Sequence, residues 1–206
     1  MIFARFMAVV ISVLLPTTLM AHESHRLSFE VGPSLGRSHL SSPWGWSQSS
    51  TYRSFGINLT HQWQASSRLS LGPVIGVHVG GGTHRQEHPM FTMGVPDGSL
   101  TQTLRQQGTV NVGARAVWML TEDLHVTGEA GLAVSQLHER FRLNTKTWND
   151  TWSQRHNHLG YYVGAGVQWQ VADHMAASFG VRHQRTSGNN LRARNTALNV
   201  GATFRF

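Results

Sequence analysis

Apolar side chains occupy every second position through most of the chain after Leu27. This two-residue period is typical of strands whose two faces meet different surroundings, and it differs from the 3.6-residue period of a helix. The pattern is clearest from Leu198 to Phe206 at the end of the chain. Eight such stretches predict strands over Leu27–Leu35, Phe55–Trp63, Leu69–Val79, Val110–Trp118, Leu124–Val134, Tyr161–Val171, Met175–Val181 and Leu198–Phe206.

The segments that connect these strands alternate between short and long. Three short turns join the second strand to the third, the fourth to the fifth and the sixth to the seventh. Strands of about ten residues, with short turns at one rim and long loops at the other, are typical of outer-membrane barrels. The sequence therefore predicts an all-β fold, an eight-stranded antiparallel up-and-down transmembrane β-barrel. Long polar loops are expected around His39–Thr51, Gly80–Arg105, Asn144–Asn157 and Gln184–Arg194.

The first residues have the pattern of a signal peptide. The apolar run Phe6–Leu15 follows Arg5 and is ended by Pro16, and it is too short to span a membrane as a helix. We expect cleavage after Ala21, which assigns residues 1–21 to the leader and 22–206 to the barrel. The chain has no cysteine, so barrel closure rather than disulfide bonds is expected to hold the exported fold together.

Five charged residues fall on the polar face of the predicted strands: Glu30, Arg115, Glu129, Arg182 and Arg205. In a barrel this face fills the lumen, where charges persist when they are paired. The tight turn of the fourth and fifth strands brings Arg115 opposite Glu129, and closure of the barrel is expected to bring Arg205 close to Glu30. Eight strands leave an interior that side chains can fill, which favours a plug of ion pairs over a narrow ion channel.

The formal net charge is +7, and most of the basic residues fall in the predicted loops. Arginine suits phosphate recognition, so a basic outer rim indicates contact with the phosphorylated sugars of lipopolysaccharide. Nucleic acid is not an expected partner, because no binding motif is present. The paired tryptophans either extend the outer aromatic girdle or form an adhesive tip for an extracellular ligand. The predicted surface-binding residues are Trp44, Trp46, Arg85, Trp148, Trp152 and Arg155.

The chain contains 13 histidines, which raises the question of a metal site. His84 and His88 share one predicted loop, and His156 and His158 share another. Such pairs are able to bind zinc or copper, but no complete ligand set with metal-site spacing is present. We predict neither a metal nor a cofactor.

The strand count, the turn pattern, the inward Glu and Arg residues and the terminal Phe206 resemble the OmpA-like and porin-family small outer-membrane β-barrels. The resemblance covers Leu27–Phe206. It implies residence in the bacterial outer membrane, and it implies that Phe206 belongs to the signal that the outer-membrane assembly machinery reads. One scaffold of this kind hosts several activities, so the resemblance leaves the function open.

Some barrels of this class modify lipid A. The stretch His183–Asn189 is similar to the lipid A deacylase signature, but Ser187 is four positions from His183 instead of two, and no acid follows Asp173. A palmitoyltransferase-like site would use His156 or His158 with Asp150 and Ser153. We therefore predict a non-enzymatic barrel with a structural or adhesive role at the cell surface. The alternatives are a lipid A-modifying enzyme and a narrow ion channel.

Overall fold

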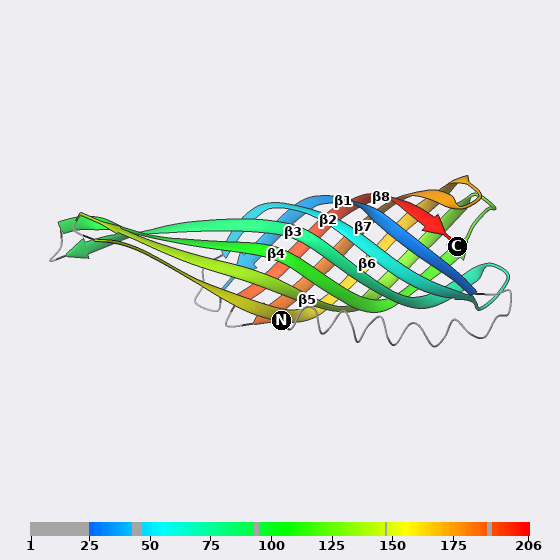
Figure 1. Cartoon of the computed structure of the whole chain (residues 1–206), viewed down its shortest axis with the longest axis horizontal. Helices are drawn as coiled ribbons and strands as arrows, with labels where there is room; N and C mark the ends of the chain where they lie inside the picture. The colour runs from blue at the N-terminus through cyan, green and yellow to red at the C-terminus, as the bar shows by residue number, and fades with distance from the viewer. Residues whose placement is uncertain (1–24, 43–46, 93–94, 147, 189–190) are drawn as a thin grey trace.

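Eight antiparallel strands form a closed barrel in the computed structural model, which describes residues 25–42, 47–92, 95–146, 148–188 and 191–206 (Figure 1). The predicted all-β, eight-stranded fold is confirmed. The predicted leader and the tryptophans Trp44 and Trp46 lie outside the described residues. Within the described part, no helix is long and apolar enough to span a membrane. The strands are β1 (His25–Ser41), β2 (Ser47–Gln64), β3 (Leu69–Thr92), β4 (Val95–Met119), β5 (Leu124–Thr145), β6 (Asn149–Ala172), β7 (Met175–Gly188) and β8 (Leu191–Arg205).

The barrel closes where β8 pairs with β1. The register runs from Ser28 opposite Arg205 to Ser41 opposite Arg192. At the end of the barrel that carries the short turns, which we call the lower end, the backbone N–H of Phe206 donates to the carbonyl oxygen of Leu27 at 2.9 Å. Closure gives every strand two neighbours at the level of the bilayer, so no backbone group there has to find a partner in lipid.

A belt of exposed apolar side chains surrounds the barrel. Leu35 is 56% exposed, Phe55 53% and Val181 44%, although burial would be favoured if water surrounded them. Trp63, Trp118, Trp169 and Phe206 are also exposed, close to the ends with short turns. An apolar band with an aromatic girdle matches the lipid-facing surface of an outer-membrane barrel, with the short turns on the periplasmic side.

The strands are much longer than the sequence predicted. They contain between 14 residues in β7 and 25 in β4. The four predicted long loops are wrong, because their residues continue the hairpins; pairing reaches Ser41–Ser47, Thr92–Val95, Asn144–Asn149 and Gly188–Leu191. Two strands that pair above the membrane keep satisfying each other's backbone groups, so the ladder need not stop where the lipid stops.

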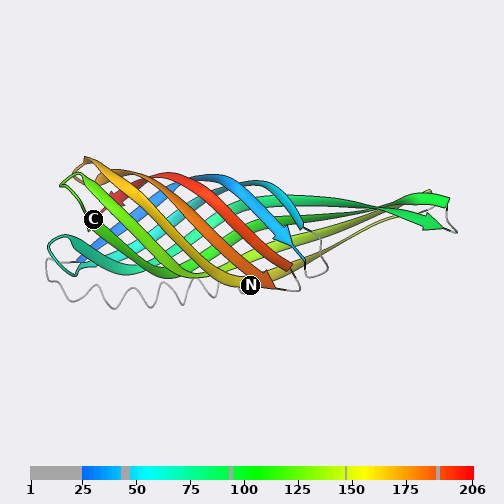
Figure 2. The same ribbon diagram turned by 180° about the vertical axis from the view of Figure 1, so that it is seen from behind.

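Four of the strands rise far beyond the others. Pairing of β2 with β3 ends at Tyr52–Gly82, and pairing of β6 with β7 ends at Leu159–Ser187. Above these points β3, β4, β5 and β6 continue as a twisted sheet, seen at the left in Figure 1 and at the right in Figure 2. We call this extension, residues 83–92, 95–106, 137–145 and 149–158, the blade.

The apolar face of the strands reverses where the blade begins. On β5, Leu132 faces outward and is 62% exposed, whereas Leu137 faces inward and is 2% exposed. On β4 the reversal coincides with a bulge, because Gln107 is an extra residue between pairs that are adjacent on β5. Below the bulge the outer face meets lipid and above it the outer face meets water, so the apolar side turns inward.

Gly80 marks the point where β3 leaves the barrel. Its φ of +104° is a backbone conformation that side-chain-bearing residues rarely adopt, and the register of β3 with β4 shifts between Val79 and Thr83. A Cβ atom at Gly80 would lie 2.5 Å from the carbonyl oxygen of Arg53. Glycine is therefore required at the base of the blade.

We expect Gly80→Ala to lower the free energy of unfolding by about 1–3 kcal/mol, because it forces a strained backbone against Arg53. Urea unfolding in lipid vesicles measures this change. The matched control is Gly128→Ala, since nothing lies within 4 Å of a Cβ at that position, and its effect is expected to stay within about 0.5 kcal/mol. Equal effects of the two substitutions would contradict the account of Gly80.

Candidate functional site

Three ion pairs, linked through Arg115 and Glu129, cross the middle of the lumen. The guanidinium of Arg115 contacts Glu30 at 2.6 Å and Glu129 at 2.8 Å, and Arg182 contacts the other oxygen of Glu129 at 2.5 Å. These four residues come from β1, β4, β5 and β7. Their side chains are at most 15% exposed, and two arginines balance two glutamates. Mutual pairing is what allows charges to stay in so narrow a space.

Neutral groups complete this cluster. Arg182 donates through Nη1 to Nε2 of His78, which assigns the ring proton of His78 to Nδ1, and its guanidinium carbon lies 5.3 Å from the ring centre of Tyr162. Ser178 donates to Glu30 at 3.3 Å. Gly56 leaves room for the imidazole, since a Cβ there would lie 2.1 Å from Nδ1 of His78.

Arg205 does not pair with Glu30 as the sequence suggested. In the register of β1 with β8, Arg205 is opposite Ser28, and Glu30 is opposite Thr203. Arg205 instead contacts Gln170 at 2.9 Å, Gln168 at 3.1 Å and His125 at 2.8 Å, lower in the lumen. The reason is the stagger of strands in a barrel, which offsets residues that a flat hairpin model would place together.

A web of amide and hydroxyl groups fills the lumen above the ion pairs. Gln106 donates to Thr109 at 2.9 Å and Asn195 donates to Gln106 at 2.9 Å. Gln184 donates to Ser135 at 2.7 Å. The web joins β4, β5, β7 and β8 and ties opposite walls together.

An apolar cluster closes the mouth of the barrel above this web. Leu40, Leu104, Leu137 and Ala193 come from four strands and are each at most 3% exposed, with Leu191 packed against them. Sequence analysis missed this cluster, because these positions lie beyond the ends of the predicted strands. The signal was present in the change of phase of the apolar residues between Val134 and Leu137.

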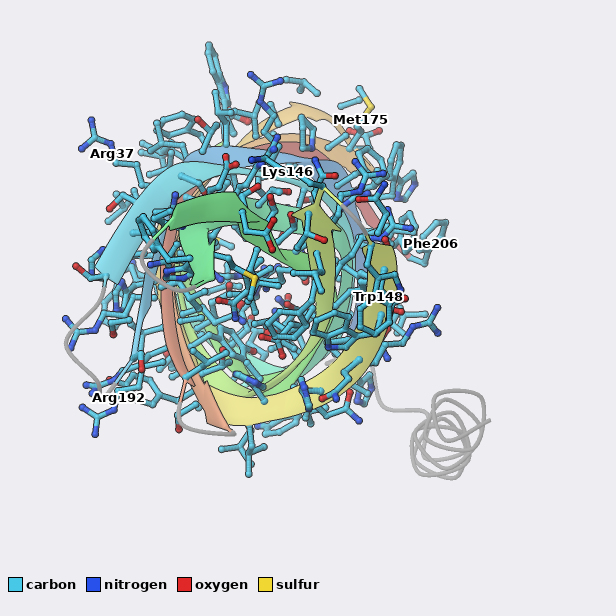
Figure 3. The ribbon with its side chains drawn as sticks, turned by 90° about the vertical axis from the view of Figure 1, so that its left-hand side faces the viewer. Arg37, Lys146, Trp148, Met175, Arg192 and Phe206 are labelled. Atoms are coloured by element: carbon cyan, nitrogen blue, oxygen red, sulfur yellow. The ribbon has the colours of Figure 1, made fainter. Side chains whose placement is uncertain are left out.

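Successive layers of side chains therefore obstruct the lumen. The two spaces beside the ion pairs have volumes of about 30 and 10 Å³, which is room for one or two water molecules. Figure 3, viewed along the barrel, shows side chains throughout the ring. This arrangement of the described residues is the one expected of a plug of ion pairs.

His84 anchors the base of the blade. Its Nε2 lies 3.1 Å from the hydroxyl of Ser38 and 3.2 Å from that of Ser50. Burial, and secondarily the positive charge of His39, lowers the pKa of His84 to about 4. The imidazole is therefore neutral near pH 7 and acts as a fixed hydrogen-bonding group.

The inner face of the blade carries an aromatic pair. Phe141 and Trp152 are opposite each other on β5 and β6, with ring centroids 5.2 Å apart and planes inclined by 16°. Trp152 remains 41% exposed. Lower on the same face, Glu139 accepts a hydrogen bond from Gln102 at 2.5 Å and contacts His156 at 3.3 Å. Stacking and hydrogen bonding thus link β4, β5 and β6 in this part of the blade.

The remaining predicted surface residues are spread over the blade. Trp148 is at the tip and is 65% exposed. Arg85 and Arg155 are exposed on the two flanking strands, β3 and β6. The structure thus brings Trp152 close to Phe141, but it does not gather Trp148, Arg85 and Arg155 into a single pocket.

Five arginines form a band on the outer surface just above the apolar belt. They are Arg37, Arg53, Arg192 and Arg194, which are exposed, and Arg185, which is partly buried; Figure 3 shows Arg37 and Arg192 pointing away from the barrel. We call this set the arginine band. Arg185 is directly opposite Arg194, and no carboxylate is opposite any member in the register of the described residues. Like charges in direct opposition destabilise a sheet unless an anion compensates them.

The residue sets considered for lipid A chemistry are not assembled. His183 and Ser187 lie on the same strand, about 13 Å apart along it, and His183 is hydrogen-bonded to Thr196 at 2.9 Å instead. Ser153 is on the outer face of β6, whereas His156 and His158 are on its inner face. Within the described residues, no group of three or more His, Asp or Glu side chains is placed to hold a metal ion.

We expect Glu129→Gln to lower the free energy of unfolding by about 3–5 kcal/mol, because it leaves two buried arginines with only one carboxylate. Urea unfolding of the protein in lipid vesicles measures the loss. Glu87→Gln serves as the control, since Glu87 is exposed on the outer face of the blade, where a charge contributes less than about 1 kcal/mol. A loss no larger than that of the control would show that the cluster does not stabilise the barrel.

Comparison with known proteins places this geometry in a family. The family model described as outer membrane protein beta-barrel domain matches residues 8–206, and no curated protein matches the chain. Similar solved structures include the attachment invasion locus protein Ail of Yersinia pestis, with 13% identity over 89% of this chain and 99% of that one and a TM-score of 0.45. The N-terminal β-barrel domain of Pseudomonas aeruginosa OprF is also similar, with 12% identity over 88% of this chain and 97% of that one and a TM-score of 0.45.

The outer membrane protease OmpT from Escherichia coli is also similar, at 8% identity, with 89% of this chain and 97% of that chain covered and a TM-score of 0.51. At these identities the likenesses concern the fold alone. The family model, in contrast, covers nearly the whole chain. The protein belongs to the outer membrane protein beta-barrel domain family and resides in the bacterial outer membrane.

Proposed function

We propose that the protein is a non-enzymatic surface anchor, held in the outer leaflet by lipopolysaccharide and presenting the blade to an extracellular ligand. The observation that carries the proposal is the arginine band. Its members cluster on β7, β8, β1 and β2, immediately above the last outward apolar residues of these strands. Lipopolysaccharide phosphates just outside the hydrocarbon layer would meet the barrel wall at this level.

The charge arrangement supports a phosphorylated partner. Arg185 faces Arg194 across β7 and β8, and Arg194 faces His39 across β8 and β1. Guanidinium groups bind phosphate oxygens in a bidentate manner. A phosphate between Arg185 and Arg194 would turn a repulsive cross-strand pair into a bridged one.

The lumen and the blade support an anchoring role over transport. The ion pairs and the apolar cluster at the mouth obstruct the barrel, which argues against the channel alternative. Among the described residues, the serine nucleophiles and histidine bases considered above are not assembled into one site, which argues against lipid A chemistry. The blade, in contrast, extends a paired sheet away from the membrane, which is the geometry of a surface-binding element.

The test is the stabilisation that purified lipopolysaccharide gives to the folded protein in detergent. We expect Arg185→Gln combined with Arg194→Gln to weaken binding roughly 30-fold, since each arginine near an anionic lipid surface contributes about 1 kcal/mol. Thermal unfolding at increasing lipopolysaccharide concentration reports the affinity.

Arg68→Gln is the matched control, because Arg68 is exposed in the periplasmic turn between β2 and β3. We expect it to leave lipopolysaccharide binding unchanged. Equal stabilisation of the double variant and the wild type would contradict the proposed role of the arginine band.

A further inference from the structure

One side of the blade ends in a strand without a neighbour. β6 pairs with β5 up to Asn149 opposite Asn144, but it pairs with β7 only from Leu159 downward. In the described part of the chain, no strand lies beside Asn149–Arg155 on the side away from β5. All seven of these residues are exposed, and they span about 23 Å.

The register identifies which backbone groups face this open side. The backbone N–H of Thr145 donates to the carbonyl oxygen of Trp148, and that of Gln170 donates to Asp123. Because hydrogen-bonded positions alternate in an antiparallel pair, the even-numbered residues of β6 bond to β5. Thr151, Ser153 and Arg155 therefore direct their backbone N–H and C=O groups outward. Of these groups, the N–H of Thr151 donates a hydrogen bond to Oδ1 of the neighbouring Asp150 side chain at 2.7 Å.

The opposite edge of the blade is protected. Pro89 removes one donor from β3, and the pairing of β3 with β4 shifts between Met90 and Phe91. Gln48 donates to the carbonyl oxygen of Arg85 at 2.8 Å. Proline, irregular pairing and a covering neighbour are among the devices by which natural sheets prevent edge-to-edge association. From Asn149 to Arg155, β6 has no proline or lysine, and its pairing with β5 has no shift.

The two faces beside the open edge differ in chemistry. On the outer face lie Arg155 and, opposite Ser153 on the next strand, Arg140. On the inner face lies the exposed ring of Trp152. A strand added to this edge would place alternate side chains beside the arginines and beside the tryptophan.

We propose that the open edge of β6 binds an extended acidic polypeptide segment by β-strand addition, with acidic side chains toward Arg140 and Arg155 and apolar ones toward Trp152. This inference rests on the proposed function, in which the blade presents a ligand-binding surface. It goes further by assigning the bound strand to one edge of the blade and by giving its charge pattern.

A second copy of the chain is a poorer occupant. Two copies in one membrane have their β6 strands running in the same direction, so self-pairing would be parallel. In-register parallel pairing would bring Arg155 next to Arg155, and like charges there are unfavourable. A separate acidic segment meets no such opposition.

The experiment measures binding of a fluorescein-labelled peptide of five Glu-Val repeats to the full chain in non-ionic detergent, by fluorescence anisotropy. We expect Ser153→Pro, which removes a backbone donor on the open side only, to weaken binding about tenfold or more. Ser153→Ala keeps the donor and is expected to bind within about twofold of the wild type. Arg155→Glu is expected to shift the preference toward a Lys-Val peptide, and circular dichroism verifies that each variant is folded.

Unchanged binding by Ser153→Pro, equal binding of the Glu-Val and Lys-Val peptides to the wild type, or no binding of either would each overturn the inference. Concentration-dependent dimerisation that Ser153→Pro abolishes, without peptide binding, would assign the edge to a second copy instead. The peptide assay contains no lipopolysaccharide, so a negative result there does not bear on the proposed role of the arginine band. A failure of lipopolysaccharide binding likewise does not bear on the proposed strand addition at the β6 edge.

Discussion

The structure depends on one constraint: the hydrocarbon of a bilayer offers no hydrogen bonds to the peptide backbone. A sheet that crosses it must close, and pairing of β1 with β8 from Ser28 to Ser41 accomplishes this. Closure in turn separates two environments, lipid outside and a narrow lumen inside. The alternation of apolar and polar residues in the lower part of the barrel follows from that separation.

The constraint ends at the rim, and the chemistry of the strands changes there. Above the belt, apolar residues such as Leu104 and Leu137 turn inward to form the cluster at the mouth, while arginines occupy the outer face. The Gln107 bulge and the glycines at Gly80 and Gly81 allow the backbone to make this change. The same chain therefore forms a barrel whose outer face suits lipid and, beyond the rim, a blade whose outer face suits water. The blade is open at the β6 edge because no membrane requires that edge to be paired.

The sequence predicted the barrel well, because lipid imposes a strict period on the residues that face it. The opposition of Arg115 and Glu129 also followed from sequence, since a short turn fixes the register of its hairpin. The expected pairing of Arg205 with Glu30 was wrong, because the stagger of the closing strands depends on the whole barrel. The blade was interpreted as loops because its outward residues are polar; the inward phase of Leu137, Phe141 and Leu143 was the missed signal. Contacts across the lumen, such as Arg115 with Glu30, depend on strands that are not neighbours and have no local signature.

The central claim is that the barrel is an anchor that displays the blade outside the cell. Because the chain contains no cysteine, single cysteines can report its orientation in intact cells with a maleimide that does not cross the outer membrane. We expect Thr151→Cys on the blade to be labelled in intact cells, and Ser67→Cys in the turn between β2 and β3 to be labelled only after the outer membrane is permeabilised. Labelling of Ser67→Cys in intact cells, with Thr151→Cys protected, would contradict the account.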